Sequence, residues 1–584
     1  MNARPPCPQS RQLTPVEIAT GVAGVLAVFF FLWPAIAFRH LVPFWDGVWV
    51  YNYLDGAALG RKPDLLSSDL FSFVDNEHRP FFPMFVWKAD YEWFNATGLM
   101  PLLLSYVFIA GSALLATSGV LSQVSWTSRF AIGAAALAIA FAPMHYYNLM
   151  WEKQVHVAMS LLMSLAALWM AGYRAGRAEK SGELVAVALA GAFGFVASFS
   201  FAYGMVVWPV LFAHALLIGW RWRGLATLAF FAASAVALYF SVWTPNPQHG
   251  NPLDTLRDPT GIYRYVAHFM AGPVSAVLRH APWYSQDVET VIGSAIVAAL
   301  VFAGLGTYLL RRSGGPGRQF GVMLVAYCLG IGSITALGRL TMNGDADVSR
   351  YLIVPVLALL ALPSLLWANG ATTREALESR LVVFGLLLIS LSFGSAPANI
   401  PEYRGVNTIV VRSALAAEFK VSETVHGLFP DKRLVDNVFW PSYRKKQNEI
   451  GRLLPFSWLG KPLAGRVEMD GSCPGHIDGL KAVKDHPGVF ITDGWARYGE
   501  LGKYVPEWVV AVNDKGVVVG LGKTLLERKD VAAFLGQLSQ GIHFREAATA
   551  GIVGYLRGSP GDALNFYALH GSKACRFFST AIPA

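Results

Sequence analysis

Charged residues are scarce in this sequence. Only 15% of its 584 residues are Asp, Glu, Lys or Arg, whereas an ordinary soluble protein has about 25%. The shortage is greatest in repeated apolar runs of about 18–22 residues, the length that crosses a bilayer as a helix. This composition excludes an ordinary soluble globular chain and predicts a polytopic α-helical membrane protein.

The sequence also lacks any block of basic residues with interleaved aromatics. The net charge of +9 therefore does not indicate a nucleic-acid partner. The arginines and lysines fall instead in short segments between apolar runs, which is the pattern of topology determinants. There is no low-complexity tract and no strict internal repeat.

Cysteine is rare, with only four residues. Cys7 precedes the first apolar run, and Cys328 lies inside a later one. Cys473 and Cys575 both lie in the polar C-terminal region. If that region is outside the cytosol, these two are the only pair available for a disulfide. Two free buried thiols are the alternative.

Eleven apolar segments are predicted to span the membrane, with ten or twelve as alternatives. The first ends in Ala35-Ile36-Ala37, a signal-cleavage pattern, but it exceeds the roughly 7–15 residues of a signal-peptide core. We therefore interpret it as a retained span, with cleavage as the alternative. The stretch 184–220 is interpreted as two short helices that meet near Tyr203-Gly204. The predicted spans are 16–37, 99–121, 129–143, 156–173, 184–202, 205–220, 224–243, 288–310, 319–338, 351–368 and 381–397.

The distribution of arginine and lysine predicts an orientation. Segments such as 174–180 and 311–318 are rich in these residues and are assigned to the cytoplasm by the positive-inside rule. The N-terminus is then cytoplasmic, and everything after residue 398 is outside. The chain is predicted to reside in a bacterial inner membrane, with its C-terminal domain in the periplasm or outside the cell. The predicted divisions are a transmembrane domain (1–397) with a large first outer loop (38–98), a helical or irregular connecting segment (398–460) and a β-sandwich-like domain (461–584).

The first outer loop and the C-terminal domain have different patterns. "FWDGVWVYNYLDGAAL" and "PMFVWKADYEWFNAT" carry aromatics at helical spacing and predict two helices on the membrane surface. "EWVVAVNDKGVVVGLG" predicts two strands around the turn from Asn513 to Gly516. "GVFITDGWA", "ATAGIVGYLRG" and "ALNFYALHG" continue the series of short strands, which is typical of a β-sandwich.

Two groups of polar residues in the first outer loop are candidates for chemistry. Asp46 lies among aromatics just after the first span, where a carboxylate is costly unless it is paired or used. It is a candidate general base or anchor for an acceptor hydroxyl, and a helix cap or a solvated aspartate is the alternative. The second group is Asp75, Glu77, His78 and Arg79. Arginine suits bidentate phosphate recognition, whereas one histidine beside carboxylates is not a metal-ligand set. A loop held by local ion pairs is the alternative.

Two further groups follow on the same predicted side. "HYYNLMWEKQVH" contains Glu152 and Lys153, for which anchoring at the interface is the alternative. "GRLTMNGDADVSRYL" contains a D-x-D pattern at 345–347, a weak match to metal-dependent nucleotide-sugar enzymes. It also contains Arg350 and Tyr351 at the mouth of a span, where a lipid phosphate would lie, or where an arginine can snorkel. The four groups together predict an outer cavity at the depth of lipid headgroups.

The sequence at this point resembles the GT-C glycosyltransferases. That superfamily has a retained first span, a long outer loop that begins with an aspartate, two surface helices, many further spans and an outer soluble domain. "NEHRPFFP" followed by "WFN" is similar to motifs of a bacterial branch, as are "SFSFAYGMVVWP" and "VSRYL". The resemblance covers about residues 16–397 and is specific at "NEHR" and "SRY". In the C-terminal region, "ITDGWA", "VVAVNDKGVVVGLG" and "ERKDVAAFLG" look like a β-rich module of some membrane glycosyltransferases.

The resemblance implies transfer of a sugar from a polyprenyl-phosphate donor to a glycan, lipid or protein acceptor on the outer face. Asp46 falls at the position of the family's catalytic aspartate. Many members have an Asp-Glu pair there, but Gly47 follows here, so either Glu77 supplies the second carboxylate or Asp46 acts alone. A divalent cation, Mg²⁺ or Mn²⁺, is an option that the sequence does not decide. The residues expected to bind the donor phosphate are His78, Arg79, Lys153, Arg350 and Tyr351, and those expected to contact sugar or acceptor are Asp75 and Glu152.

The alternative function is a transporter or flippase of lipid-linked sugars. Transporters usually place charged groups near the bilayer midplane. In this sequence the spans are nearly free of charge, and charged residues collect at one predicted face. This distribution favours an enzyme that works at the membrane surface.

Overall fold

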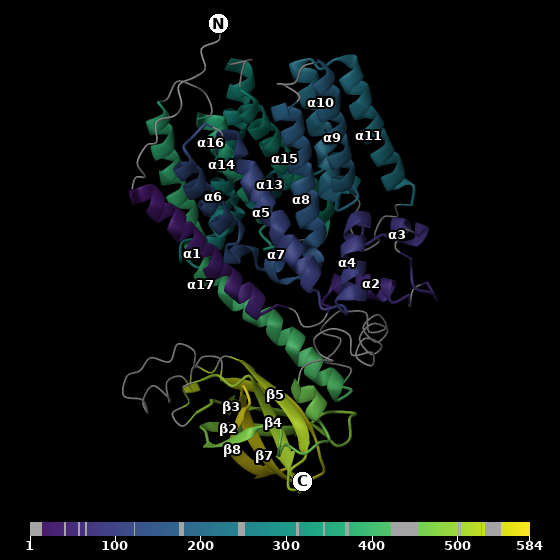
Figure 1. Cartoon of the computed structure of the whole chain (residues 1–584), viewed down its shortest axis with the longest axis vertical. Helices are drawn as coiled ribbons and strands as arrows, with labels where there is room; N and C mark the ends of the chain where they lie inside the picture. Colours follow the sequence, from purple (N-terminus) through teal and green to yellow (C-terminus); the bar gives the residue numbers. More distant parts are fainter. Residues whose placement is uncertain are drawn as a thin grey trace. The chain divides into compact units, whose positions relative to one another are not determined.

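The computed structural model describes a mostly helical chain with a β-rich C-terminal part (Figure 1). The predicted connecting segment 398–460 lies partly outside the described residues, as does most of "ERKDVAAFLG". The structure describes residues 15–39, 43–56, 59–64, 67–121, 123–174, 180–242, 252–310, 315–342, 345–367, 373–421, 454–499, 502, 504–526, 528, 530–531 and 550–584.

Helices occupy each of the eleven apolar segments, and several shorter helices lie in the connections. The longer helices are α1 (Pro15–Ala37), α5 (Leu99–Leu121), α6 (Trp126–Ala140), α8 (Val155–Trp169), α9 (Lys180–Ser198), α10 (Val207–Ile218), α11 (Trp222–Phe240), α13 (Pro259–Leu278), α14 (Gln286–Leu310), α15 (Pro316–Arg339), α16 (Ile353–Trp367) and α17 (Arg374–Glu418). The shorter ones are α2 (Asp46–Leu54), α3 (Ser68–Ser72), α4 (Phe81–Trp93), α7 (Tyr146–Met150) and α12 (Pro252–Thr255).

Within the described residues, seven helices are long and apolar enough to cross a membrane. The number rises to eight if the bent pair Trp126–Ala140 and Pro143–Met150 is one span. Three further apolar helices are shorter, namely Glu183–Ser198, Ala202–Ile218 and Ile353–Trp367. The chain is thus compatible with a multi-pass membrane protein, but the predicted total of eleven spans is not confirmed.

The predicted break near Tyr203 is confirmed. Helix α9 ends at Ser198, a 3-10 turn covers Ala202–Val206, and α10 begins at Val207. Gly204 permits this geometry, because a Cβ on it would lie only 2.1 Å from the carbonyl carbon of Ala197.

The described contacts divide the chain into two compact units. The first contains residues 1–38, 64–86 and 101–403, and the second contains residues 39–63, 87–100 and 404–584. The predicted boundary at residue 397 falls inside α17, which continues to Glu418 although Pro397 and Pro401 lie within it. Apolar patterning marked where a membrane span would end, but the helix itself extends further.

Both segments of 38–98 that were predicted to be helical form helices, α2 and α4. In the second unit they share a polar network that centres on Asp90, which is fully buried. Its carboxylate accepts hydrogen bonds from the hydroxyl of Tyr51 (3.0 Å) and the backbone N–H groups of Gly98 and Met100 (2.8 and 3.2 Å). Asp90 therefore caps the start of α5 while it holds α2, which explains an aspartate inside this aromatic helix.

The C-terminal strands form one sheet of eight in the order β1-β8-β7-β4-β5-β6-β3-β2. The hairpin around Asn513–Gly516 and the other three predicted strand segments are confirmed, as β4 and β5, β3, β6 and β7. The strands are β1 (Glu468–Ser472), β2 (Gly475–Ala482), β3 (Val489–Ala496), β4 (Trp508–Asn513), β5 (Val518–Leu526), β6 (Gly551–Arg557), β7 (Ala563–His570) and β8 (Lys573–Ala581).

The prediction of a two-sheet sandwich is wrong, because these strands belong to one continuous sheet. Strands β1 and β2 are at opposite edges of the hydrogen-bonded order, yet only Cys473 and Pro474 separate them along the chain. The sheet must therefore roll up so that its two edges meet. The predicted disulfide between Cys473 and Cys575 of β8 is present at this closure, with a Cα–Cα distance of 5.6 Å. Alternating patterns give the strands, but not which strands pair.

The end of α17 packs on the sheet within the second unit. The ring of Phe419 stacks on Tyr555 of β6, with centroids 6.0 Å apart, and the guanidinium of Arg557 lies over Phe419. Arg557 also donates a hydrogen bond to the backbone oxygen of Glu418 (3.3 Å). Desolvation raises the pKa of the Glu418 carboxyl to about 7, although the charge of Arg557 opposes the shift. This contact therefore contains a carboxyl that titrates near neutral pH.

Candidate functional site

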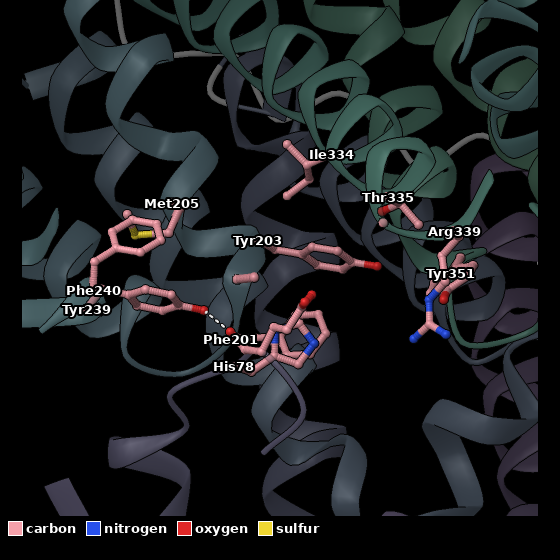
Figure 2. Close-up of a pocket in the computed structure, with 13 residues that line it drawn as sticks. His78, Phe201, Tyr203, Met205, Tyr239, Phe240, Ile334, Thr335, Arg339 and Tyr351 are labelled. Atoms are coloured by element: carbon pink, nitrogen blue, oxygen red, sulfur yellow. Dashed lines mark hydrogen bonds between the residues drawn. The ribbon is translucent and has the colours of Figure 1, made fainter. Parts of the chain in front are cut away.

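A cavity of about 270 Å³ lies in the first unit, at one end of its helices. Helices α11 and α15 end there, α10 and α16 begin there, and the turn 75–78 reaches it from the first outer loop. Aromatic side chains form much of the wall, and a carboxylate, an imidazole and a guanidinium also face the space (Figure 2). The lining residues are Glu77, His78, Phe201, Ala202, Tyr203, Met205, Tyr239, Phe240, Ile334, Thr335, Gly338, Arg339 and Tyr351.

The polar motif before Pro80 is a tight turn. Asp75 and His78 exchange two backbone hydrogen bonds, with N–O distances of 3.0 and 2.9 Å. Asn76 has a φ of 53°, a left-handed conformation that asparagine tolerates better than most residues. The turn places the half-buried side chains of Glu77 and His78 at the cavity. The ring of His78 packs against Phe201, with centroids 3.9 Å apart.

Buried partners fix this turn to the helices. The Nζ atom of Lys153 lies 2.6 Å from a carboxylate oxygen of Asp75, and both side chains are 3% exposed or less. The hydroxyl of Tyr239 donates to the backbone oxygen of Glu77 at 2.8 Å (Figure 2). Removing one partner of a buried ion pair typically costs about 3–5 kcal/mol. Asp75 and Lys153 therefore position Glu77 and His78, and neither lines the cavity.

Arg79 occupies a different place from the one expected. Its side chain is fully buried, and its guanidinium donates to the backbone oxygens of Phe71, Leu238 and Tyr239. It also lies over the rings of Phe71 and Phe199, 4.6 and 5.6 Å from their centroids. This position argues against the predicted phosphate contact and favours a structural role. The sequence predicted an arginine at the depth of lipid headgroups, but it could not show which carbonyls from α11 surround it.

The "SRY" segment contributes a second wall of the cavity. Tyr351 lines the space, and the guanidinium of Arg350 lies 5.1 Å from the centre of the Tyr351 ring. The side-chain amide of Asn148 donates to the backbone oxygens of Ser349 and Arg350, at 3.4 and 3.1 Å. The backbone N–H of Tyr147 donates to the hydroxyl of Ser349 at 3.2 Å. The segment 145–156 thus holds both the "SRY" segment and, through Lys153, the turn 75–78.

Three of the four predicted groups therefore converge. Glu77, His78 and Tyr351 line the cavity, whereas Asp75, Glu152 and Lys153 are buried and do not line it. Asp46 belongs to the second unit. It is half-buried and is the first residue of α2, whose cap position is taken by Trp45. The helix therefore starts at Asp46 itself, within its first turn.

Sequence reasoning did not select several lining residues. Phe201 and Tyr203 lie in "SFSFAYG", which was interpreted only as a helix break and a family motif, and Arg339 lies in "GRLTMNGDADVSRYL" but was not selected there. Figure 2 shows the Tyr203 hydroxyl pointing to the side of the cavity where Arg339 and Tyr351 lie. Among the described residues, no ion pair to Arg339 occurs. An arginine just after a Gly at the end of an apolar helix was the available signal.

The cavity has both polar and lipid-compatible walls. Phe240 and Ile334 line it, and their side chains are 51% and 36% exposed. In a membrane-spanning chain, exposed apolar residues of this kind face lipid. Glu77, His78 and Arg339 face the same space. The arrangement suits an amphiphile with an anionic polar head and an apolar tail.

The described residues do not fit a divalent metal ion. No group of three or more His, Cys, Asp or Glu side chains is arranged to hold one in the part of the chain that the structure describes. In the D-x-D segment, the Asp347 carboxylate instead pairs with the guanidinium of Arg279 at 3.1 Å. Mg²⁺ and Mn²⁺ need several oxygen ligands together, so we assign them no step.

Comparison of the chain with protein-family models, with curated proteins and with solved structures finds no match. The GT-C fold and the resemblance to its bacterial branch therefore stay predictions from the sequence.

Two arginines should respond oppositely to substitution. Arg79→Lys removes most of the buried hydrogen bonds to backbone oxygens, so we expect the unfolding free energy to fall by about 1–3 kcal/mol with little change in phosphate binding. Arg339→Gln should leave thermal stability nearly unchanged. If the cavity binds a lipid phosphate, this change should weaken the binding of undecaprenyl phosphate about 10- to 100-fold, because a charged hydrogen bond is lost. Thermal unfolding and titration of purified protein measure both quantities. If folded Arg79→Lys protein binds the lipid phosphate more weakly than the wild type, Arg79 contacts the phosphate after all.

Proposed function

We propose that this protein is a membrane glycosyltransferase that takes a sugar from a polyprenyl-phosphate donor. The observation that carries the proposal is the cavity, which combines aromatic walls, a carboxylate and a guanidinium with exposed apolar residues. Aromatic faces suit sugar rings, the guanidinium suits a phosphate, and the apolar wall suits a lipid tail. The headgroup of the donor would occupy the cavity while its tail stays in the bilayer.

In this proposal the acceptor hydroxyl attacks the anomeric carbon of the donor sugar. The bond between that carbon and the phosphate oxygen breaks, and the polyprenyl phosphate leaves with the electron pair. Glu77 accepts the hydroxyl proton, and Arg339 stabilises the leaving phosphate, with Arg350 as a second cation. His78 and Tyr203 orient the sugar hydroxyls. Asp46 is the alternative general base, because the resemblance implies that role for it.

The distribution of charge in the spans supports an enzyme over a transporter or flippase. The described candidate spans carry their acidic and basic residues near their ends, as Glu17, Arg318 and Glu378 do. Transporters of charged substrates place such groups near the midplane. The cavity also lies at one end of the helices, where a headgroup would meet a water-soluble acceptor.

Filling the cavity tests this function. A Cβ on Gly338 would meet no atom within 4 Å, and Gly338 lines the cavity, so Gly338→Leu should project into open space. Leucine is also a better helix residue than glycine, by roughly 0.5–1 kcal/mol. We expect the Gly338→Leu protein to have normal thermal stability but not to bind undecaprenyl phosphate. When it is expressed in a deletion strain, it should not restore the glycan that the strain lacks.

Gly306→Leu is the matched control, because a Cβ on Gly306 of α14 also meets nothing within 4 Å and Gly306 does not line the cavity. It should bind the lipid and restore the glycan as the wild type does. A deletion strain with an unchanged glycan profile, or full complementation by a folded Gly338→Leu protein, would overturn the proposal. Accumulation of an intact lipid-linked sugar on the inner leaflet would instead favour the flippase.

A further inference from the structure

A second, apolar groove shares no lining residue with the cavity. It has a volume of about 360 Å³ and is formed by α1, α5 and α6 in the first unit. Val25 and Phe29 from α1, Leu114 from α5 and Leu137 from α6 form its walls. None of these residues enters the proposed transfer reaction. The groove therefore needs its own explanation.

Close packing of α1 on α6 shapes this groove. A Cβ on Gly24 would lie 2.7 Å from the backbone of Ala134, so the two helices touch there. At the neighbouring position of α6, the absence of a side chain at Gly133 leaves space, since a Cβ there would meet only Leu114, at 3.5 Å. The groove follows α6 from residue 126 to residue 137, which is about 16 Å at 1.5 Å per residue.

One end of the groove carries a cation and an indole. Trp126, the first residue of α6, is 78% exposed, and Arg129 is exposed one turn later. The Nε atom of Arg129 donates to the backbone oxygen of Val124 at 3.1 Å, which holds the guanidinium at this end. Tryptophan and arginine at a helix end are typical of the level of lipid headgroups. The remainder of the lining is apolar, and it includes Phe29 and Phe130, which are 69% and 46% exposed.

We propose that this groove binds one acyl chain of an anionic phospholipid, whose phosphate headgroup pairs with Arg129. Charge complementarity selects this occupant, because the single cation lies at the interfacial end of an otherwise apolar channel. Basic pockets between membrane helices are known to select anionic headgroups. A zwitterionic phospholipid such as phosphatidylcholine also has a phosphate, but the cation in its headgroup offsets the attraction to Arg129. The site is independent of the sugar-transfer proposal, since it shares no residue with the cavity.

The test compares Arg129→Gln with Arg223→Gln in purified, delipidated full-length protein. Arg223 is the matched control because it also lies beside an exposed tryptophan at the start of a span, with its guanidinium 5.7 Å from the Trp222 ring, but it lines no part of the groove. Native mass spectrometry measures binding of phosphatidylglycerol and of phosphatidylcholine. The wild type and Arg223→Gln should prefer phosphatidylglycerol, and Arg129→Gln should lose about fivefold in phosphatidylglycerol affinity, as expected for one basic residue.

Three further arms identify the occupant. Gly133→Leu should fill the groove and lower the binding of both lipids, while thermal unfolding confirms that the variant is folded. Inorganic phosphate at millimolar concentration should not compete, because it lacks the acyl chain. The proposal would be refuted if Arg129→Gln bound phosphatidylglycerol as tightly as the wild type does. It would also be refuted if Arg223→Gln lost as much phosphatidylglycerol affinity as Arg129→Gln. A detergent-stable dimer that Gly133→Leu dissociates would refute it as well, because a second copy would then be the occupant.

Discussion

Glu77→Gln should lower the rate of sugar transfer by about 100- to 10,000-fold, the usual effect of losing a general base. Glutamine keeps the size of the side chain but removes its charge and basicity. Folding should survive, because the hydrogen bond from Tyr239 goes to the backbone oxygen of Glu77 and not to its carboxylate. The measurement is the initial rate of transfer at saturating donor, with thermal unfolding as the check on folding.

Asp46→Asn is the competing variant. The resemblance to GT-C enzymes assigns the base to Asp46, whereas the cavity contains Glu77. A large loss in Glu77→Gln with a small one in Asp46→Asn would make Glu77 the base. The reverse result would leave Glu77 as a residue that contacts sugar hydroxyls. Equal and large losses would indicate that both carboxylates act in one step, and wild-type rates in both variants would refute general-base catalysis by either.

Loss of the disulfide should have the largest effect on stability. Cys473 and Cys575 are 102 residues apart in the sequence, and closing a loop of that length contributes up to about 4–5 kcal/mol in the chain-entropy model. The bond also joins the link between β1 and β2 to β8, where the edges of the sheet meet. Cys473→Ala/Cys575→Ala should therefore unfold the sheet at a lower denaturant concentration while the helical unit remains folded.

Cys328→Ala is the control, since Cys328 is a buried free thiol inside α15. It should leave the unfolding of the sheet unchanged. Alkylation with and without reductant, read by mass spectrometry, shows whether the bond exists in purified protein. Identical mass shifts in the two conditions would mean that the cysteines are reduced and that the stability argument does not apply.

Local chemistry determined much of this protein. Apolar runs of helical length specify the helices, because only a helix satisfies the backbone in lipid. Alternation and the Asn513–Gly516 turn specify strands. The compositional change after the last apolar run separates Cys473 and Cys575 from the other two cysteines, and this marked them as the candidate pair. Polar residues beside aromatics at Glu77, His78 and Tyr351 were recognisable because polarity at a membrane edge is costly without a use.

Only the tertiary structure decided which polar residues share a space. The sequence predicted Arg79 as a phosphate ligand, but in the structure its guanidinium donates to the backbone carbonyls of Phe71, Leu238 and Tyr239. Arg339 was not selected from the sequence, but the end of α15 places it at the cavity. The rolled sheet depends likewise on pairing between strands far apart in sequence. The periodicity of a segment indicates which of its faces is buried. A site or a closed sheet depends instead on contacts between segments that are far apart in the sequence, and tertiary packing determines those contacts.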